Sequence, residues 1–284
     1  MAVKIVECPR DAMQGWPHFI ATPTKIDYLK LLLKVGFDTL DCGSFVSSKA
    51  VPQLTDSLEV VEAIAPFKQS TKLLTIVANT QGAKTATGIE AVDVIGFPFS
   101  ISETFQIRNT KQTIAESTDT LKHLLDISSK NNKQVQVYLS MCFGNPYQDA
   151  WSTDLVLDWC QRLQAIGVQM INLSDTIGVA KPADIALVFE QVKTIIGIEF
   201  GAHFHTTYIN AQEHIEAAYK SGCRKFDAAI KGFGGCPFAA DKLTGNLPTE
   251  TLIAYLNDLH ESHSIDQDAF ARAMAKSQDV FVEG

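Results

Sequence analysis

The sequence predicts an α/β fold: a single (β/α)8 (TIM) barrel with a short C-terminal helical extension. Short apolar, β-branched runs recur eight times along the 284 residues, and helical stretches of roughly 10–20 residues separate them. Strands that alternate with helices build a parallel sheet from βαβ units. No linker or low-complexity block divides the chain, so we expect one domain over 1–284, with the barrel at about 3–248 and the helical tail at about 249–284.

The predicted strands begin near Val3, Phe37, Thr71, Ala91, Lys133, Val168, Gly197 and Lys225. The helices with the clearest signals are Thr24–Leu33 before Gly36, Ala150–Ile166, one that opens at Lys181–Asp184, and Tyr208–Tyr219 before Gly222. Glycine commonly follows the last turn of a helix, and proline, here Pro182, suits the first turn. An open doubly wound sheet is the alternative, but no G-x-G-x-x-G motif follows the first strand.

Composition excludes several classes of protein. Hydrophobic residues make up 46% and charged residues 20%, which is typical of a globular protein. The net charge of −8 disfavours a nucleic-acid partner, and no apolar run approaches the roughly 18 residues of a membrane span. The segment Met1–Glu7 lacks the pattern of a signal peptide, and the six dispersed cysteines form no C-x-x-C pair. We therefore expect a cytoplasmic protein with reduced thiols.

Polar residues collect where the predicted strands end. In a barrel of this type the functional residues lie at the carboxyl ends of the strands. The polar segments there are Glu7–Gln14, Asp41–Phe45, Ser140–Gly144, Asn172–Thr176, His203–Thr206 and the loop Lys231–Asn246. We therefore expect a functional site at this end of the barrel.

His203 and His205 give the sharpest local signal. Residues two apart on a strand project to the same side, so the two imidazoles can chelate one cation. Barrel closure brings the first and last strands together, which places Asp11 within reach, and the loop after the last strand supplies Asn246. This set of nitrogen and oxygen ligands suits Mg²⁺ or Mn²⁺, with Zn²⁺ as a third candidate. Taken singly, Asp11 also fits a helix cap and Asn246 a turn.

Four further side chains are candidates for catalysis. Arg10, beside Asp11, could stabilise an enolate or a carbonyl oxygen, although a surface salt bridge is the commoner role of arginine. Cys236 lies in a glycine-rich loop and could act as a general acid or base, whereas most free cysteines are inert and buried. Asp41 and Asp175 could be bases or could orient the histidines, and a structural hydrogen-bonding role fits them equally.

Several motifs together resemble the hydroxymethylglutaryl-CoA lyase family. Lys4–Gln14 is similar to the opening motif of metal-dependent barrel lyases and synthases that carry an Arg-Asp pair after the first strand. The more particular segments are Ser44–Gln53, Asp175–Val179, His203–His205 and Gly234–Ala239, and the resemblance extends from Lys4 to about Glu250. It implies a (β/α)8 barrel with a divalent cation that cleaves 3-hydroxy-3-methylglutaryl-CoA into acetyl-CoA and acetoacetate.

The resemblance also implies roles for individual residues. Asp11, His203, His205 and Asn246 would bind the metal, Arg10 would stabilise the thioester enolate, and Cys236 would transfer a proton. Gln14, which ends the opening motif, joins the candidate catalytic residues, and Asp41 or His203 could accept the proton of the substrate hydroxyl. The expected partner is an acyl-CoA substrate. We expect the protein to form a homo-oligomer, a dimer, and to bind neither nucleic acid nor a membrane.

The chain departs from the family pattern in places. Asp41 stands where the family usually has glutamate, Thr207 where it often has aspartate, and the segment between Cys236 and Asn246 is one residue longer. Two alternatives therefore stay open: a related Claisen-type synthase or aldolase, and a non-catalytic barrel. The Gly-Gly-Cys-Pro motif at 234–237 argues against the synthase, because related condensing enzymes lack that cysteine.

Overall fold

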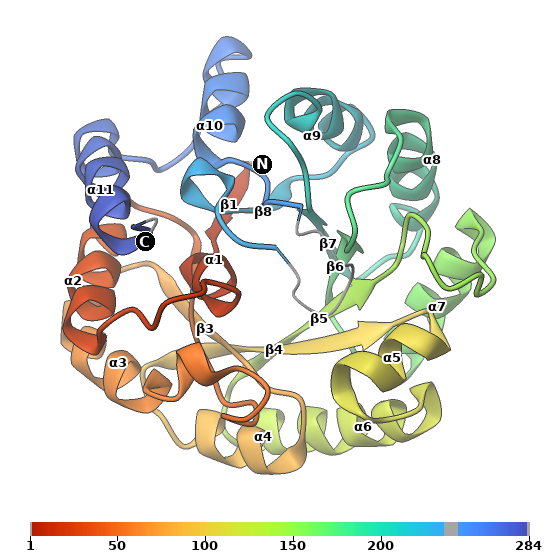
Figure 1. The fold of residues 1–284 in the computed structure, drawn as a ribbon. Helices are drawn as coiled ribbons and strands as arrows, with labels where there is room; N and C mark the ends of the chain where they lie inside the picture. The colour runs from red at the N-terminus through yellow and green to blue at the C-terminus, as the bar shows by residue number, and fades with distance from the viewer. Residues whose placement is uncertain (1, 236–243, 283–284) are drawn as a thin grey trace.

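The computed structural model describes residues 2–235 and 244–282, in which eight parallel strands close into a barrel in the order of the sequence (Figure 1). The strands are β1 (Lys4–Glu7), β2 (Thr39–Ser44), β3 (Lys72–Ile76), β4 (Val92–Ser100), β5 (Gln134–Ser140), β6 (Met170–Asp175), β7 (Glu199–Phe204) and β8 (Lys225–Ala228). Pairing of β8 with β1 closes the barrel. The predicted (β/α)8 fold is confirmed.

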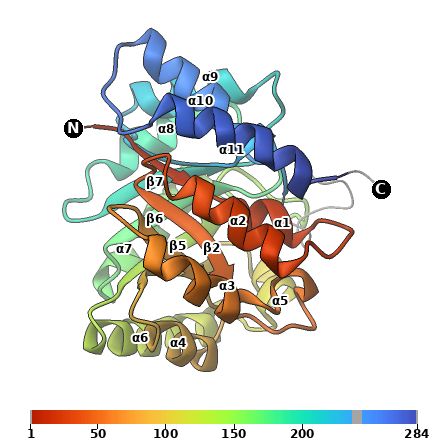
Figure 2. The same ribbon diagram turned by 90° about the vertical axis from the view of Figure 1, so that its left-hand side faces the viewer.

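Helices surround the barrel on its outside, whereas the short α1 (Pro9–Gln14), which directly follows β1, lies inside their ring (Figures 1 and 2). The surrounding helices are α2 (Thr22–Leu32), α3 (Ser57–Ile64), α4 (Thr80–Thr87), α5 (Glu103–Thr110), α6 (Ile114–Lys130), α7 (Thr153–Ala165), α8 (Pro182–Val192), α9 (Ala211–Lys220), α10 (Thr249–Asp258) and α11 (Gln267–Val280). Short 3-10 turns lie at η1 (Pro52–Leu54), η2 (Ala65–Phe67) and η3 (Ile230–Gly232). The C-terminal helices α10 and α11 pack against α9 and α2, so they complete the outer ring. None of the described helices is both long and apolar enough to cross a membrane.

Local hydrogen bonds explain where the helices depart from the predicted bounds. α7 begins at Thr153 rather than Ala150, because the Ser152 side chain accepts from the Leu155 N–H and caps the helix. α9 begins at Ala211 rather than Tyr208, because Thr207 donates its N–H and hydroxyl to Asn210 and holds a turn there.

Gly36 does not directly follow α2, which ends at Leu32. It lies in the next turn at φ +91°, and a Cβ there would be 2.3 Å from the Ser264 carbonyl oxygen. Glycine therefore lets this turn approach the segment that leads into α11.

The apolar core lies mainly between the sheet and the helices, where Phe97, Phe99 and Phe204 are fully buried. The barrel interior differs from this core. Buried Lys225 and Asp227 alternate along β8, which places their side chains on the same face of the strand. Polar groups therefore occupy the interior beside β7 and β8, below the end at which the functional residues were predicted.

Candidate active site

A cavity of about 620 Å³ opens at the carboxyl ends of the strands. Arg10, Asp11, His203 and His205 border one part of it, and the end of α5 with the residues that follow borders another part. The cavity therefore lies where the strand-end rule for this fold places functional residues.

Asp11, His203 and His205 form a cluster that could hold a metal ion. Each offers one ligand atom, and these atoms lie within 4.8 Å of one another. The two imidazoles share one face of the chain at the end of β7, with ring centroids 5.1 Å apart. Asp11 lies in the first turn of α1, which directly follows β1, and β1 pairs with β8, the neighbour of β7. Barrel closure thus brings together residues that are far apart in the sequence.

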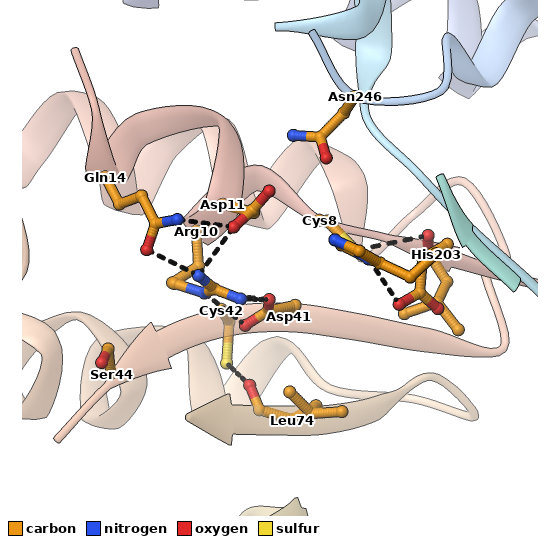
Figure 3. Close-up of polar contacts among 12 residues, drawn as sticks. Cys8, Arg10, Asp11, Gln14, Asp41, Cys42, Ser44, Leu74, His203 and Asn246 are labelled. Carbon is orange, nitrogen blue, oxygen red and sulfur yellow. Dashed lines mark hydrogen bonds and ion pairs between the residues drawn. The ribbon is translucent and has the colours of Figure 1, made fainter. Parts of the chain in front are cut away.

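Asn246 completes the predicted ligand set. Its backbone lies beside His205 as an antiparallel bridge, and the adjacent Leu247 N–H donates to the Phe204 carbonyl at 3.0 Å. Its side-chain Nδ2 donates to the Phe233 carbonyl at 2.8 Å, and its amide oxygen, for which the described residues supply no hydrogen bond, could serve as a ligand. Figure 3 shows Asn246 facing Asp11 and His203. The extended segment along the end of β7 therefore positions Asn246.

The free atoms of the cluster fit a divalent cation. Among the described residues, the buried Asp11 Oδ2 and His205 Nδ1 have no hydrogen-bond partner. Burial acts to raise the pKa of Asp11, but the charge of Arg10, ahead of the smaller effect of the His203 ring, outweighs it and lowers the pKa, so Asp11 is ionised. Burial, aided by His203, lowers the pKa of His205 to about 4, so its ring is neutral at pH 7. An ionised carboxylate and a neutral imidazole are the forms that bind metals.

Arg10 is fixed by three side chains (Figure 3). Its Nε donates to Asp41 at 2.9 Å, and its Nη1 donates to Asp11 at 2.9 Å and to Gln14 at 2.8 Å. Gln14 Nε2 in turn donates to Asp11 at 2.7 Å. A guanidinium group has five N–H donors, and these bonds together with the one from Nη2 to Asp41 engage four of them. One N–H remains for a ligand in the cavity that Arg10 borders.

The structure places the two other candidate carboxylates outside the cavity. Asp41 is fully buried, and both of its oxygens accept from Arg10; burial raises its pKa to about 6, although Arg10 acts to lower it. Asp175 accepts from the backbone N–H groups of Val179 and Ala180, at 3.0 and 2.9 Å. Its carboxylate therefore holds the turn after β6 and is not brought to the metal cluster. Cys236 lies outside the described residues.

Sequence reasoning missed Asp227. Its Oδ2 lies 3.0 Å from His203 Nδ1, and the two residues are opposite each other in the pairing of β7 with β8. The alternation of Lys225 and Asp227 along β8 was the available signal, because two polar residues two apart on a predicted strand share a face. The sequence also gave no indication of Arg108 and Lys111, which border the cavity at the end of α5.

Comparisons with known proteins match HMG-CoA lyases over nearly the whole chain. The HMGL-like family model matches residues 2–276. The cytoplasmic 3-hydroxy-3-methylglutaryl-CoA lyase of Rattus norvegicus is 33% identical over 266 residues, which cover 93% of this chain and 77% of the relative. The hydroxymethylglutaryl-CoA lyase of Pseudomonas mevalonii is 30% identical over 273 residues, 95% of this chain and 90% of the relative. A solved HMG-CoA lyase from Acenitobacter baumannii, in complex with coenzyme A and 3-methylmalate, is 29% identical with a TM-score of 0.90 and covers 99% of this chain and 91% of that chain.

Proposed function

The chain belongs to the HMGL-like family and is a carbon–carbon lyase, and on this premise we propose that it cleaves 3-hydroxy-3-methylglutaryl-CoA into acetyl-CoA and acetoacetate. The observation that carries the proposal is the meeting of a fixed arginine and a set of free metal ligands in one cavity. Cleavage requires loss of the proton on the C3 hydroxyl, breakage of the C2–C3 bond and protonation of the resulting acetyl-CoA enolate. Negative charge develops on the hydroxyl oxygen and then on the enolate, so these steps need positive charge at fixed positions.

Asp11, His203, His205 and Asn246 are the residues that would hold a divalent cation. A bound cation would supply Lewis-acid polarisation of the substrate hydroxyl and a template for its carboxylate. The charges of the site favour such an ion: the buried carboxylates of Asp11 and Asp41 both pair with the single positive charge of Arg10. One negative charge remains uncompensated among these three buried groups, and burial of unpaired charge is costly.

Arg10 is the residue that we propose for stabilising the enolate. Its guanidinium is held by Asp41, Asp11 and Gln14, so no reorganisation is needed when negative charge develops on the thioester oxygen. In this proposal Asp41 acts through Arg10 rather than on the substrate, because it is fully buried and both of its oxygens accept from the guanidinium. Protonation of the enolate carbon is assigned to Cys236, on the resemblance of its Gly-Gly-Cys-Pro motif alone.

We further propose that Arg108 and Lys111 bind the phosphate groups of coenzyme A. They are the cations besides Arg10 among the described residues that border the cavity, and both are exposed. The Arg108 guanidinium lies 5.1 Å from the ring centroid of Tyr147, which restrains it at the cavity edge. A chain of net charge −8 thus presents positive charge where an anionic substrate would enter.

A double variant, Arg108→Gln with Lys111→Gln, tests the coenzyme A site. We expect KM for the acyl-CoA to rise several-fold, with kcat within about two-fold, because the lost contacts lie far from the reacting carbons. The effect should shrink at high salt, since exposed charges are screened. Lys122→Gln on α6, an exposed cation that does not border the cavity, is the control and should leave KM unchanged. An unchanged KM in the double variant would contradict this site.

The lyase assay tests the proposal as a whole. Protein stripped of metal with EDTA is incubated with 3-hydroxy-3-methylglutaryl-CoA, alone or with Mg²⁺, Mn²⁺ or Zn²⁺, and acetoacetate and acetyl-CoA are measured. We expect equal amounts of both products, only when a cation is added. Condensation of acetyl-CoA with a keto acid, without cleavage, would instead identify the synthase alternative, and no reaction with any cation would favour a binding protein. A cytoplasmic homodimer remains part of this proposal, and light scattering tests the oligomeric state.

A further inference from the structure

We propose that Asp227 and Asn172 form a positioning pair that fixes the tautomer of His203, so that its Nε2 atom is presented to the cation site. The inference rests on the proposed cation site, but it does not depend on which substrate the protein cleaves.

The contact between Asp227 and His203 sets the position of one proton. Asp227 Oδ2 lies 3.0 Å from His203 Nδ1, and both side chains are largely or fully buried within the barrel. A carboxylate oxygen accepts a hydrogen bond, so in the neutral form of the imidazole this contact places the proton on Nδ1. The lone pair is then on Nε2, at the opposite side of the ring from Asp227. This is the arrangement in which a histidine can bind a metal.

Asn172 holds the other side of the same carboxylate. Its Nδ2 donates to Asp227 Oδ1 at 2.7 Å, so each oxygen of Asp227 has one side-chain partner. Gly201 makes room for this side chain, since a Cβ at 201 would lie 2.5 Å from Asn172 Oδ1. Asn172 on β6 and Asp227 on β8 therefore orient the imidazole of His203 on β7, the strand between them in the sheet.

Asp227 differs from Glu7, a buried carboxylate on the neighbouring strand β1. Glu7 accepts from the Ile230 N–H and the Thr249 hydroxyl, and thereby ties β1 to the segments after β8. Asp227 forms no comparable bond to a loop, and within residues 2–235 and 244–282 its one ion-pair contact is with His203. Its geometry serves the histidine rather than the backbone.

The test measures cation affinity directly, with Mn²⁺ as the probe and metal-stripped full-length protein. Free Mn²⁺ is followed by EPR during titration of the wild type, of Asp227→Asn and of Asn172→Ala. Loss of such an outer partner typically weakens metal binding about 10–100-fold, and we expect this range for Asp227→Asn and a smaller loss for Asn172→Ala. The matched control is Glu7→Gln, a buried carboxylate on the neighbouring β1 with two hydrogen bonds, which should bind Mn²⁺ within about two-fold of the wild type.

A spectroscopic readout separates positioning from general stability. In ¹⁵N-histidine NMR spectra of metal-free wild type, we expect His203 to carry its proton on Nδ1, and we expect this population to fall in Asp227→Asn. A neutral His203 ring with its proton on Nε2 instead of Nδ1 in the wild type, or unchanged Mn²⁺ affinity in Asp227→Asn, would overturn the inference. Should Asp227→Asn fail to fold, Asn172→Ala and the wild-type spectrum still decide it. If the wild type binds Mn²⁺ as expected but cleaves no acyl-CoA, the proposed function falls and this inference stands.

Discussion

Asp11 and Asp175 are both buried aspartates at the carboxyl end of the barrel, yet they differ in which of their oxygens stay unbonded. In α1, which follows β1, Asp11 Oδ1 accepts from Arg10 and Gln14, while Oδ2 has no partner among the described residues. At the end of β6, both oxygens of Asp175 accept from backbone N–H groups of the turn that follows. One carboxylate keeps a free acceptor, and the other has used both oxygens to shape its own turn.

The comparison teaches that location at a strand end is not enough to identify a functional carboxylate. Burial of an ionised group is costly unless its lone pairs are satisfied, so a free buried acceptor indicates that something else binds there. Asp11 meets that condition and has His203 and His205 close by, whereas Asp175 does not. We therefore expect substitutions of the two aspartates to damage different properties, cation binding for Asp11 and stability for Asp175.

The largest effect is expected for Asp11→Asn. The substitution keeps the shape of the side chain but removes the one negative charge among the proposed ligands, which disfavours a divalent cation. We expect Mn²⁺ affinity to fall by at least about 100-fold, beyond the usual effect of an outer partner, with activity lost at cation concentrations that saturate the wild type. EPR titration and the acetoacetate assay measure the two effects. Normal Mn²⁺ affinity in this variant would remove the basis for the contrast with Asp175.

Arg10→Lys should reduce turnover next most strongly. Lysine keeps the charge but cannot reproduce the fork that bonds Asp41, Asp11 and Gln14 at once. Loss of one fixed donor to a developing oxyanion commonly costs about 10²–10³-fold in kcat, and we expect this range. Mn²⁺ affinity should stay within a few-fold, because the ligand atoms are unchanged. A fall in KM or in cation affinity alone, with kcat preserved, would show that Arg10 does not act in the transition state.

Asp175→Asn tests the other aspartate of the comparison. The amide can still accept one backbone hydrogen bond, but its NH2 group would face the second donor, Val179 or the buried Ala180, and leave that N–H without its acceptor. Such a loss costs about 1–3 kcal/mol of unfolding free energy, which urea denaturation measures. We expect Mn²⁺ affinity to remain within a few-fold of the wild type. A loss of affinity as large as that of Asp11→Asn would show that Asp175 also orients the cation site.

The fold and the cluster of Asp11, His203 and His205 could be predicted from the sequence. The repeat of strand and helix gave the barrel, the spacing of His203 and His205 placed both rings on one face, and barrel closure brought in Asp11. These inferences need only periodicity and the neighbours of each strand, both of which are local or follow from the fold class. The predicted starts of α7 and α9 were less accurate, because local side-chain hydrogen bonds decide them: Ser152 caps α7, and Thr207 donates to Asn210 in the turn before α9.

The remainder depends on register and side-chain direction. Asp227 faces His203 only because β7 and β8 pair in that register, and register cannot be read from one strand alone. Asp41 and Asp175 looked equivalent in the sequence, since both end predicted strands; which of their oxygens are used depends on Arg10 and on the turn after β6. Lys111 reaches the cavity because α5 is an additional helix after β4, which no pattern indicated.

Glu7 extends the contrast to a third buried carboxylate and is expected to affect stability alone. Burial raises its pKa to about 8, against the hydrogen bonds from Thr249 and Ile230. The folded state therefore holds a proton that the unfolded state has lost above its own pKa of about 4.3. The unfolded state binds fewer protons between about pH 4.3 and 8, so this group lowers the free energy of unfolding as pH rises through that range.

Glu7→Gln removes the titration and can keep both hydrogen bonds, because the Gln oxygen accepts from Ile230 and its NH2 group donates to the Thr249 hydroxyl. We expect urea denaturation to show the variant gaining stability relative to the wild type by more than about 1 kcal/mol between pH 5 and pH 8. The same difference at both pH values would mean that Glu7 is ionised throughout. Glu7 would then resemble Asp175, whose hydrogen bonds to the backbone satisfy its charge, rather than being a carboxyl group that the fold keeps protonated.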